Sequence, residues 1–156
     1  MNDEVRDRPN RIPWPPIIYA VAAVIAYVID RTIDLFPPKL AGLGATGWAI
    51  AAAGLAIAVA GVVQFKLSGT PVDPTGRATV LATGGIYRFT RNPMYLGGAV
   101  ICLGLALALR SGGLLVVLPG VVIALDRLAI AREEAYLTRR FGAAYEGYCG
   151  RVRRWF

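Results

Sequence analysis

Long stretches without a charged residue divide the chain and predict its helices. They cover residues 12–29, 40–65, 92–109 and 111–125, which is 18, 26, 18 and 15 residues. A bilayer-spanning helix needs roughly 20 residues, within a range of about 17–25. The alternative is a soluble Ala-rich helical bundle, but a soluble domain of this size is rarely as apolar as this chain, in which 56% of the residues are hydrophobic. We predict an all-α, polytopic membrane protein with about four transmembrane helices.

The first two helices are expected to anchor the chain. The first covers roughly 15–29, with Trp14 and Tyr19 at its membrane interface. No signal-peptide cleavage site is evident, so we expect this helix to be retained. The second covers about 43–65 and carries small residues at four-residue spacing, which let helix backbones approach closely in lipid. These rows are Ala52, Ala56 and Ala60, and Gly54 with Ala58.

The third and fourth helices are expected to form a hairpin. The third begins near Pro93 and ends at Arg110, and the fourth starts near Leu114. Fifteen uncharged residues cover only roughly 22 Å of a ~30 Å core. Either the hairpin is short, or Asp126 and Arg127 lie inside the bilayer margin. At that depth they would form a functional pair in which each is the other's partner, and the alternative is a snorkelling pair at the headgroups.

Two segments are expected outside the spans. Residues 66–83 contain Gly, Pro and Thr breaks and predict a loop. Beyond the fourth span, Leu137, Phe141, Tyr145 and Tyr148 recur at three- and four-residue spacing beside basic residues. This stripe predicts a C-terminal helix that lies on or near the membrane surface.

Charge predicts the orientation. Of the 17 Lys and Arg residues, 14 fall on one side of a four-span topology, and the other side holds Arg31, Lys39 and Arg110. The positive-inside rule makes the crowded side cytoplasmic, with both termini there and, in a bacterium, the inner membrane as the location. No nucleic-acid partner is expected, because the arginines flank membrane segments and form no continuous basic face.

Composition limits the available chemistry. The chain has no histidine, and its two cysteines, Cys102 and Cys149, are far apart in sequence. We therefore expect neither a disulfide nor a bound metal. Any chemistry must use carboxylates, tyrosines, arginines and the backbone, or come from an organic cofactor.

A dense polar cluster, GGIYRFTRNPMYLGG at residues 84–98, precedes the third helix. Asn92 is placed to cap this helix, and Pro93 suits its first position. The positive end of the helix dipole, with Arg88 and Arg91, favours an anion such as a carboxylate or phosphate. An ordinary cap beside positive-inside arginines is the alternative. The segment also supplies rings, hydroxyls and close backbone approach from Tyr87, Tyr95, Gly84, Gly85, Gly97 and Gly98.

Two carboxylates, Glu133 and Glu134, are expected to face this cluster. The hairpin turn is short, so the fourth helix brings them toward residues 92–93. Asp126 and Glu133 are seven residues apart and share a helix face, as do Arg127 and Glu134. A zwitterionic cofactor with a carboxylate, a ribose diol and a positive centre would match both walls. The alternative is a solvated helix that carries glutamates beside arginines.

Three separated motifs resemble one family. TGGIYRFTRNPMYLG, the REE after the last span, and FGxxYxxY followed by RVRRW resemble the isoprenylcysteine carboxyl methyltransferase-like family. These membrane methyltransferases also resemble the phospholipid methyltransferases. The resemblance covers roughly residues 66–156. We expect one domain, 1–156, in which residues 1–65 form two anchoring helices and 66–156 form the catalytic core.

The resemblance implies a site for S-adenosylmethionine at the cytosolic end of the hairpin. Arg91, Tyr95 and Glu134 are the candidates for catalysis. The family often has His where Asn92 stands, which excludes a mechanism that needs a base there, and Arg153 stands where Pro is commoner. The implied cofactor-binding residues, with Arg88 added for its charge, are Tyr87, Arg88, Arg91, Asn92, Pro93, Tyr95, Leu96, Gly97, Glu133 and Glu134.

The implied activity is methyl transfer from S-adenosylmethionine to a lipophilic acceptor, either a prenylcysteine-like carboxylate or a lipid amine, at the cytosolic membrane face. Arg91 and the start of the third helix would hold the cofactor's carboxylate, and Glu133 or Glu134 its ribose hydroxyls or amino group. The acceptor would enter from the lipid between small-residue helices. The alternatives are an NADPH-dependent membrane reductase of the sterol reductase type and a non-catalytic membrane module.

Overall fold

A computed structural model describes residues 12, 14–69 and 80–156, and this part of the chain is helical without strands. Short 3₁₀ helices at Pro38–Leu43 and Gly85–Arg88 precede α2 and α3. A six-residue π-helical turn, Leu125–Ile130, joins α4 directly to α5. The α-helices are α1 (Trp14–Thr32), α2 (Gly44–Leu67), α3 (Pro93–Ala108), α4 (Gly112–Ala124), α5 (Ala131–Phe141) and α6 (Ala143–Cys149).

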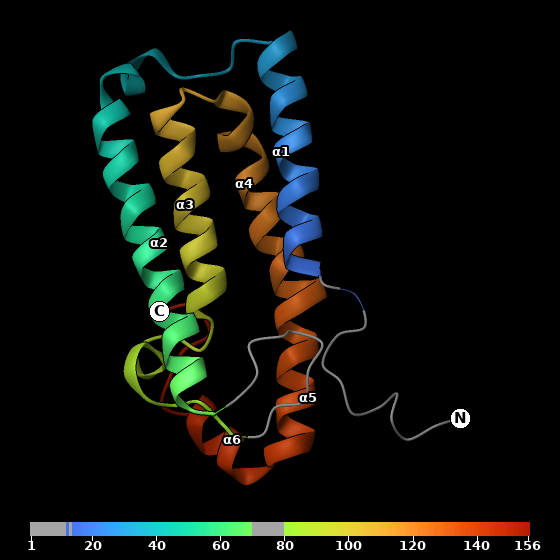
Figure 1. Cartoon of the computed structure of the whole chain (residues 1–156). Helices are drawn as coiled ribbons and strands as arrows, with labels where there is room; N and C mark the ends of the chain where they lie inside the picture. Colours follow the sequence, from blue (N-terminus) through green and yellow to red (C-terminus); the bar gives the residue numbers. More distant parts are fainter. Residues whose placement is uncertain (1–11, 13, 70–79) are drawn as a thin grey trace.

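The helices confirm an all-α, polytopic membrane protein. Among the described residues, three segments are long and apolar enough to cross a bilayer, namely Trp14–Thr32, Pro38–Leu67 and Gly112–Phe141, and α3 is a shorter apolar helix. In Figure 1, α2 and α3 lie side by side, as do α1 and α4, while α5 and α6 extend beyond the bundle at one end. The connections from α1 to α2 and from α3 to α4 lie at the opposite end.

Glycine brings α2 and α3 into backbone contact. A Cβ on Gly104 would lie 2.7 Å from the carbonyl oxygen of Gly47, and a Cβ on Gly97 would lie 2.6 Å from that of Gly54. Such close approach is a principal means of helix association in lipid. The predicted row of Gly54 and Ala58 thus faces α3. The other predicted row was wrong, because Ala52, Ala56 and Ala60 are exposed on the outside of α2.

The turn between α3 and α4 moves both predicted helix ends by two residues. α3 ends at Ala108, before Arg110, which adopts a left-handed φ of 56°. α4 begins at Gly112 because Ser111 is its N-cap and accepts a hydrogen bond from the Leu114 amide at 2.9 Å. Asp30 of α1 accepts hydrogen bonds from the Ser111 hydroxyl and, at 2.7 Å, from the Gly113 amide, which ties α1 to this turn.

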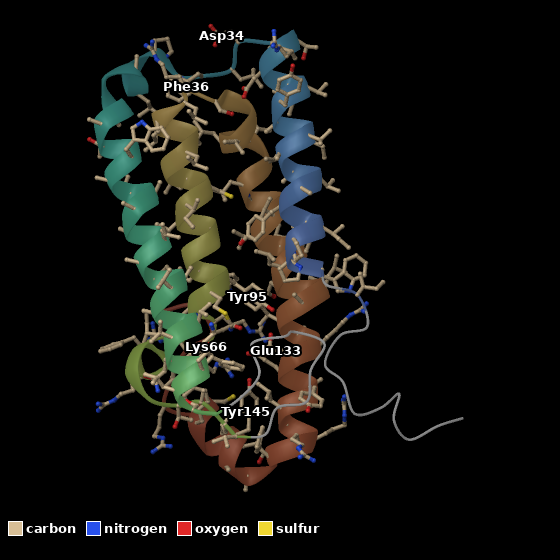
Figure 2. The ribbon with its side chains drawn as sticks, viewed as in Figure 1. Asp34, Phe36, Lys66, Tyr95, Glu133 and Tyr145 are labelled. Carbon is tan, nitrogen blue, oxygen red and sulfur yellow. The ribbon has the colours of Figure 1, made fainter. Side chains whose placement is uncertain are left out.

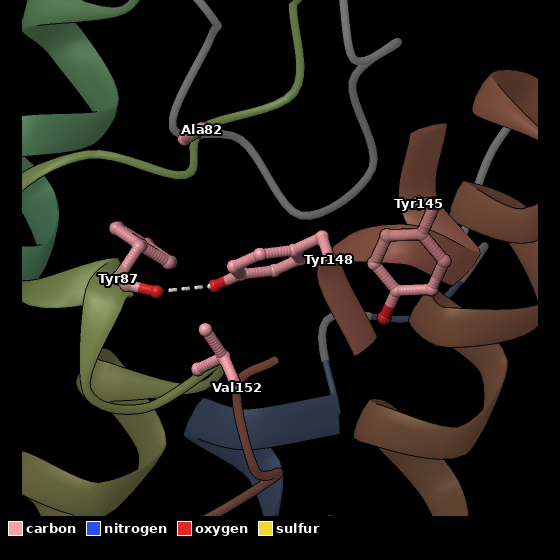
Figure 3. Close-up of a cluster of buried hydrophobic side chains, with 5 residues drawn as sticks. All are labelled: Ala82, Tyr87, Tyr145, Tyr148 and Val152. Atoms are coloured by element: carbon pink, nitrogen blue, oxygen red, sulfur yellow. Dashed lines mark hydrogen bonds between the residues drawn. The ribbon is translucent and has the colours of Figure 1, made fainter. Parts of the chain in front are cut away.

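The predicted C-terminal helix is divided in two, and its apolar stripe packs against protein. Gly142, with a φ of +52°, separates α5 from α6 and turns the chain back toward α3. Tyr145 and Tyr148 are buried in a cluster with Tyr87, which Figure 3 shows from close by. The apolar stripe therefore packs against the polar segment before α3 instead of against lipid.

Candidate functional site

The N-terminal turn of α3 meets the carboxylates of α5 directly. The Tyr95 hydroxyl donates to the Glu133 carboxylate at 3.0 Å, and Figure 2 shows both residues at the same end of the bundle. The Arg91 guanidinium, just before α3, pairs with Glu134 at 3.3 Å. Both of these charged side chains are largely shielded from solvent, with exposed fractions of 15% and 16%. The hairpin thus brings together the two groups as expected.

A second arginine, which the sequence did not single out, completes this cluster. Arg154, near the C-terminus, donates to both oxygens of Asp126 at 3.0 and 3.1 Å. Its Nε also donates to Glu134 at 3.2 Å, and its Nη2 pairs with the other oxygen of the same carboxylate. The result is a charge network, Arg91–Glu134–Arg154–Asp126, in which two cations balance two anions. Hydrogen bonding to Glu134 is the main cause that raises the pKa of Arg154.

The predicted Asp126–Arg127 pair is absent from this network. Asp126 pairs with Arg154, and the Arg127 side chain is exposed. Arg154 joins Asp126 to Glu134, whereas Glu133 accepts from Tyr95, so Asp126 and Glu133 have different hydrogen-bond partners. A π-helical turn that contains Asp126 precedes the two glutamates. Its i→i+5 hydrogen bonding takes up one more residue than α-helical i→i+4 bonding, so the downstream helix rotates relative to an unbroken α-helix.

Asn92 acts differently from its predicted role. Its side chain caps no backbone group of α3, although Pro93 occupies the first helical turn as expected. Instead, Asn92 Nδ2 donates to the Arg154 carbonyl oxygen at 3.0 Å, and the Thr90 hydroxyl donates to the same oxygen at 3.2 Å. The Arg91 amide donates to the Arg153 carbonyl oxygen at 3.0 Å. We call residues 153–156 the C-terminal strap.

Two buried tyrosines, Tyr87 and Tyr148, line the side of the site next to the 3₁₀ helix Gly85–Arg88. The Tyr148 hydroxyl donates to the Tyr87 carbonyl oxygen at 2.6 Å (Figure 3). Burial raises the pKa of Tyr148 to about 12, and of the smaller effects the Arg91 charge lowers this pKa while Cys149 raises it. Burial, and next the Glu133 charge, raises the pKa of Tyr87. The Tyr87 hydroxyl and the Arg91 Nε are both buried without a hydrogen-bond partner in the described structure.

The remaining predicted site residues pack between helices, make backbone hydrogen bonds or are exposed. Pro93 is fully buried and faces Gly61 of α2. Gly97 lies in the α2–α3 contact, so it serves packing. Leu96 is half-buried and donates its amide to Asn92, while the Arg88 side chain is exposed. Sequence analysis did not predict the role of Arg154, although this residue stands in the RVRRW motif. Arg154 is far along the chain from residues 126 and 134, and no sequence pattern indicates that they are in contact.

Comparison with known proteins identifies the family. The model of the phospholipid methyltransferase family matches residues 43–144, from the start of α2 into α6. The matched range begins upstream of residue 66, where the sequence resemblance was expected to start. Searches of curated proteins and of solved structures found no match. With several helices suited to crossing a bilayer, the fold is that of an integral membrane protein. The chain belongs to the phospholipid methyltransferase family, a family of membrane methyltransferases.

Proposed function

We propose that this protein transfers a methyl group from S-adenosylmethionine to a lipophilic acceptor at the cytosolic face of the membrane. The observation that carries the proposal is the meeting of Arg91 and Tyr95, at the start of α3, with the α5 carboxylates in a chain of a methyltransferase family. The family match covers most of this region, and we assign the catalytic core to residues 66–156, with residues 1–65 as the anchoring part.

Two unpaired polar atoms fit a bound polar cofactor. Buried groups without partners are rare and each costs about 1–3 kcal/mol, so they call for an explanation. The Arg91 Nε–H is a donor suited to the cofactor's carboxylate, and the Tyr87 hydroxyl can donate or accept. The positive end of the α3 dipole also favours an anion at Arg91. The residues present therefore fit S-adenosylmethionine.

The two glutamates are suited to different tasks. Glu134 already binds two guanidinium groups, so its role is to hold Arg91. Glu133 has the Tyr95 hydroxyl as its hydrogen-bond partner and no ion pair among the described residues. A carboxylate without a counter-charge attracts a cationic group and accepts from hydroxyls. We assign the cofactor's amino group or ribose hydroxyls to Glu133.

The protein's contribution is binding and orientation. When bound, S-adenosylmethionine supplies a methyl group on a positively charged sulfur, so the reactive chemistry belongs to the cofactor. Arg91, Glu133 and Tyr95 would hold the donor in one orientation. Alignment of donor and acceptor accounts for a large part of the rate in such transfers. No basic side chain at Asn92 is needed for this role.

The acceptor, a prenylcysteine-like carboxylate or a lipid amine, must approach from the lipid. The expected path between small-residue helices is blocked in α2 and α3, whose backbones touch at Gly47 and Gly104. We assign the approach to the side of α3 that faces α1. There the Tyr19 hydroxyl is buried without a partner and occupies the place of a Cβ on Gly98.

A titration of the purified protein in lipid nanodiscs tests the cofactor. We expect saturable S-adenosylmethionine binding that Glu133→Gln or Arg91→Ala weakens at least about tenfold, since each removes a charged hydrogen-bonding group worth about 1.5–3 kcal/mol. Arg139→Ala, on the exposed end of α5, is the charge-matched control. Absence of binding would refute the assignment. Saturable binding of NADPH instead would support the reductase alternative.

A further inference from the structure

The C-terminal strap connects both walls of the proposed site. Through its backbone it accepts hydrogen bonds from the start of α3, at the Arg91 amide, the Thr90 hydroxyl and the Asn92 side chain. Through the Arg154 guanidinium it binds the carboxylates of Asp126 and Glu134 on the opposite helix. A segment that only packed against the bundle would not need hydrogen bonds to both walls.

Arg154 supplies a geometry that a simple point charge would not. Its planar guanidinium uses Nη1 for both oxygens of Asp126, and Nε with Nη2 for the two oxygens of Glu134. Paired hydrogen bonds of this kind fix the orientation of a carboxylate as well as its charge. Glu134 in turn presents one oxygen to Arg91 at 3.3 Å. The position of Arg91 therefore depends on Arg154 through Glu134.

We propose that Arg154 is a positioning residue for the cofactor site, because it holds Glu134 and through it the Arg91 guanidinium. The inference rests on the proposed function for the identity of the ligand, S-adenosylmethionine. The claim that Arg154 holds Glu134 and Arg91 in place does not depend on that ligand. Without Arg154, Asp126 and Glu134 are two carboxylates with one cation, Arg91, between the two walls. Repulsion and the loss of four hydrogen bonds then release Arg91 from its orientation.

Cofactor affinity tests the first consequence. Arg154→Ala should raise the dissociation constant for S-adenosylmethionine by about ten- to a hundredfold, which corresponds to about 1.4–2.8 kcal/mol. Arg154→Lys keeps the charge but loses the planar fork, so it should restore part of the affinity. Arg151→Ala removes the same charge from an exposed side chain three residues away and should change the constant by less than about twofold. Turnover at saturating donor should fall less than affinity.

Cys149 offers a readout without any cofactor. Arg91 Nη1 donates to the Cys149 thiol in α6, so release of Arg91 removes a cation and a donor from the sulfur. In a Cys102→Ser background, Arg154→Ala should change the rate of Cys149 modification by a maleimide by about fivefold or more, because the thiolate is the reactive form and a neighbouring cation favours it. Arg151→Ala should leave that rate unchanged.

The two readouts separate this inference from the proposed function. If the unaltered protein binds no S-adenosylmethionine, the proposed function fails, while the Cys149 rates still decide the role of Arg154. If folded Arg154→Ala binds the cofactor and reacts with maleimide like the unaltered protein, Arg154 is not a positioning residue. Should Arg154→Ala fail to fold, Arg154→Lys and Asp126→Asn take its place in both measurements, and normal behaviour of both variants contradicts the inference.

Discussion

Neighbouring residues on one helix have opposite surroundings in this protein. Glu133 and Glu134 are separated by about 100° around α5, as in any α-helix. Glu134 points to two guanidinium groups, whereas Glu133 meets the hydroxyl of Tyr95. The difference matters because a neutralised carboxylate holds structure, while one without a counter-charge attracts a cation. We therefore expect the two glutamates to differ in function although the sequence presents them as a pair.

The Tyr148 hydroxyl should make stability depend on alkaline pH. Its folded pKa of about 12 exceeds the ordinary value near 10, so folding favours the neutral phenol. This contribution is complete below pH 10 and is lost as the pH rises from about 10 to 12. Tyr148→Phe should weaken that dependence and lower the unfolding free energy at neutral pH by about 1–2 kcal/mol, since the Tyr87 carbonyl loses its donor.

Thermal unfolding followed by circular dichroism over this pH range provides the measurement. Tyr27→Phe, at an exposed position of α1, is the control for removing a phenolic hydroxyl. If Tyr148→Phe and the unaltered protein lose stability in parallel between pH 10 and 12, the Tyr148 hydroxyl does not carry the effect.

Residue-level prediction succeeded where one turn joins two helices. Arg91 and Tyr95 meet Glu133 and Glu134 because the short α3–α4 connection makes the helix ends neighbours, and hydropathy alone reveals that connection. The contact of Arg154 depends on the change of direction at Gly142, which no hydrophobic periodicity indicates. The sequence likewise does not indicate that the strap lies beside Asn92. It therefore predicts that the Asn92 side chain caps α3, whereas this side chain donates to the strap.

At the element scale, the π-helical turn sets the rotation of α5. Removing one residue from Leu125–Ile130 should restore α-helical bonding and rotate the downstream carboxylates by about 100° relative to α4. Deletion of Arg127, whose side chain is exposed, should therefore reduce S-adenosylmethionine affinity by more than about tenfold. Arg127→Ala keeps the turn and should bind normally. Equal affinities in the two variants would show that the turn has no part in site geometry.

The α2–α3 contact should tolerate no added carbon at its glycines. A Cβ on Gly104 would lie 2.7 Å from backbone atoms of α2, which forces the helices apart. Gly104→Ala should lower stability by about 1–3 kcal/mol, the usual effect of overpacking. Gly120→Ala meets no atom within 4 Å and should stabilise α4 by about 0.5–1 kcal/mol. Thermal midpoints in one detergent give the comparison, and a similar midpoint for both variants contradicts the expected difference.

The uncharged runs predicted the helices themselves. They did not predict which face of each helix packs against the rest of the protein. Two rows of small residues on α2 satisfied the same four-residue spacing. The row that packs is that of Gly54 and Ala58, and Gly47 and Gly61 lie in the same contact, where the missing side chains let the backbones approach. The alanine row faces outward. Likewise, the periodicity of the aromatic stripe in α5 and α6 is compatible with packing against lipid or against protein. The stripe packs against protein because the chain changes direction at Gly142.

At the scale of the whole molecule, one end of the bundle holds the site. The N-terminal ends of α1 and α3 lie there, with α5, α6 and the C-terminal strap, while Asp34 and Phe36 lie at the other end (Figure 2). A soluble, charged nucleoside cofactor does not cross a bilayer unaided. The end with the site must therefore face the compartment that supplies the donor.

Charge predicts that this compartment is the cytoplasm, because a four-span topology assigns 14 of the 17 Lys and Arg residues of the sequence to the side that carries Glu133 and Glu134. Single-cysteine variants in a background without Cys102 and Cys149 make the orientation measurable in a bacterial inner membrane. A membrane-impermeant maleimide should label Asp34→Cys in intact spheroplasts and Phe156→Cys only after lysis, since both side chains are exposed. The reverse pattern would place the carboxylates of α5 away from the cytosol, where no donor could reach them, and the proposed activity could not operate in that orientation.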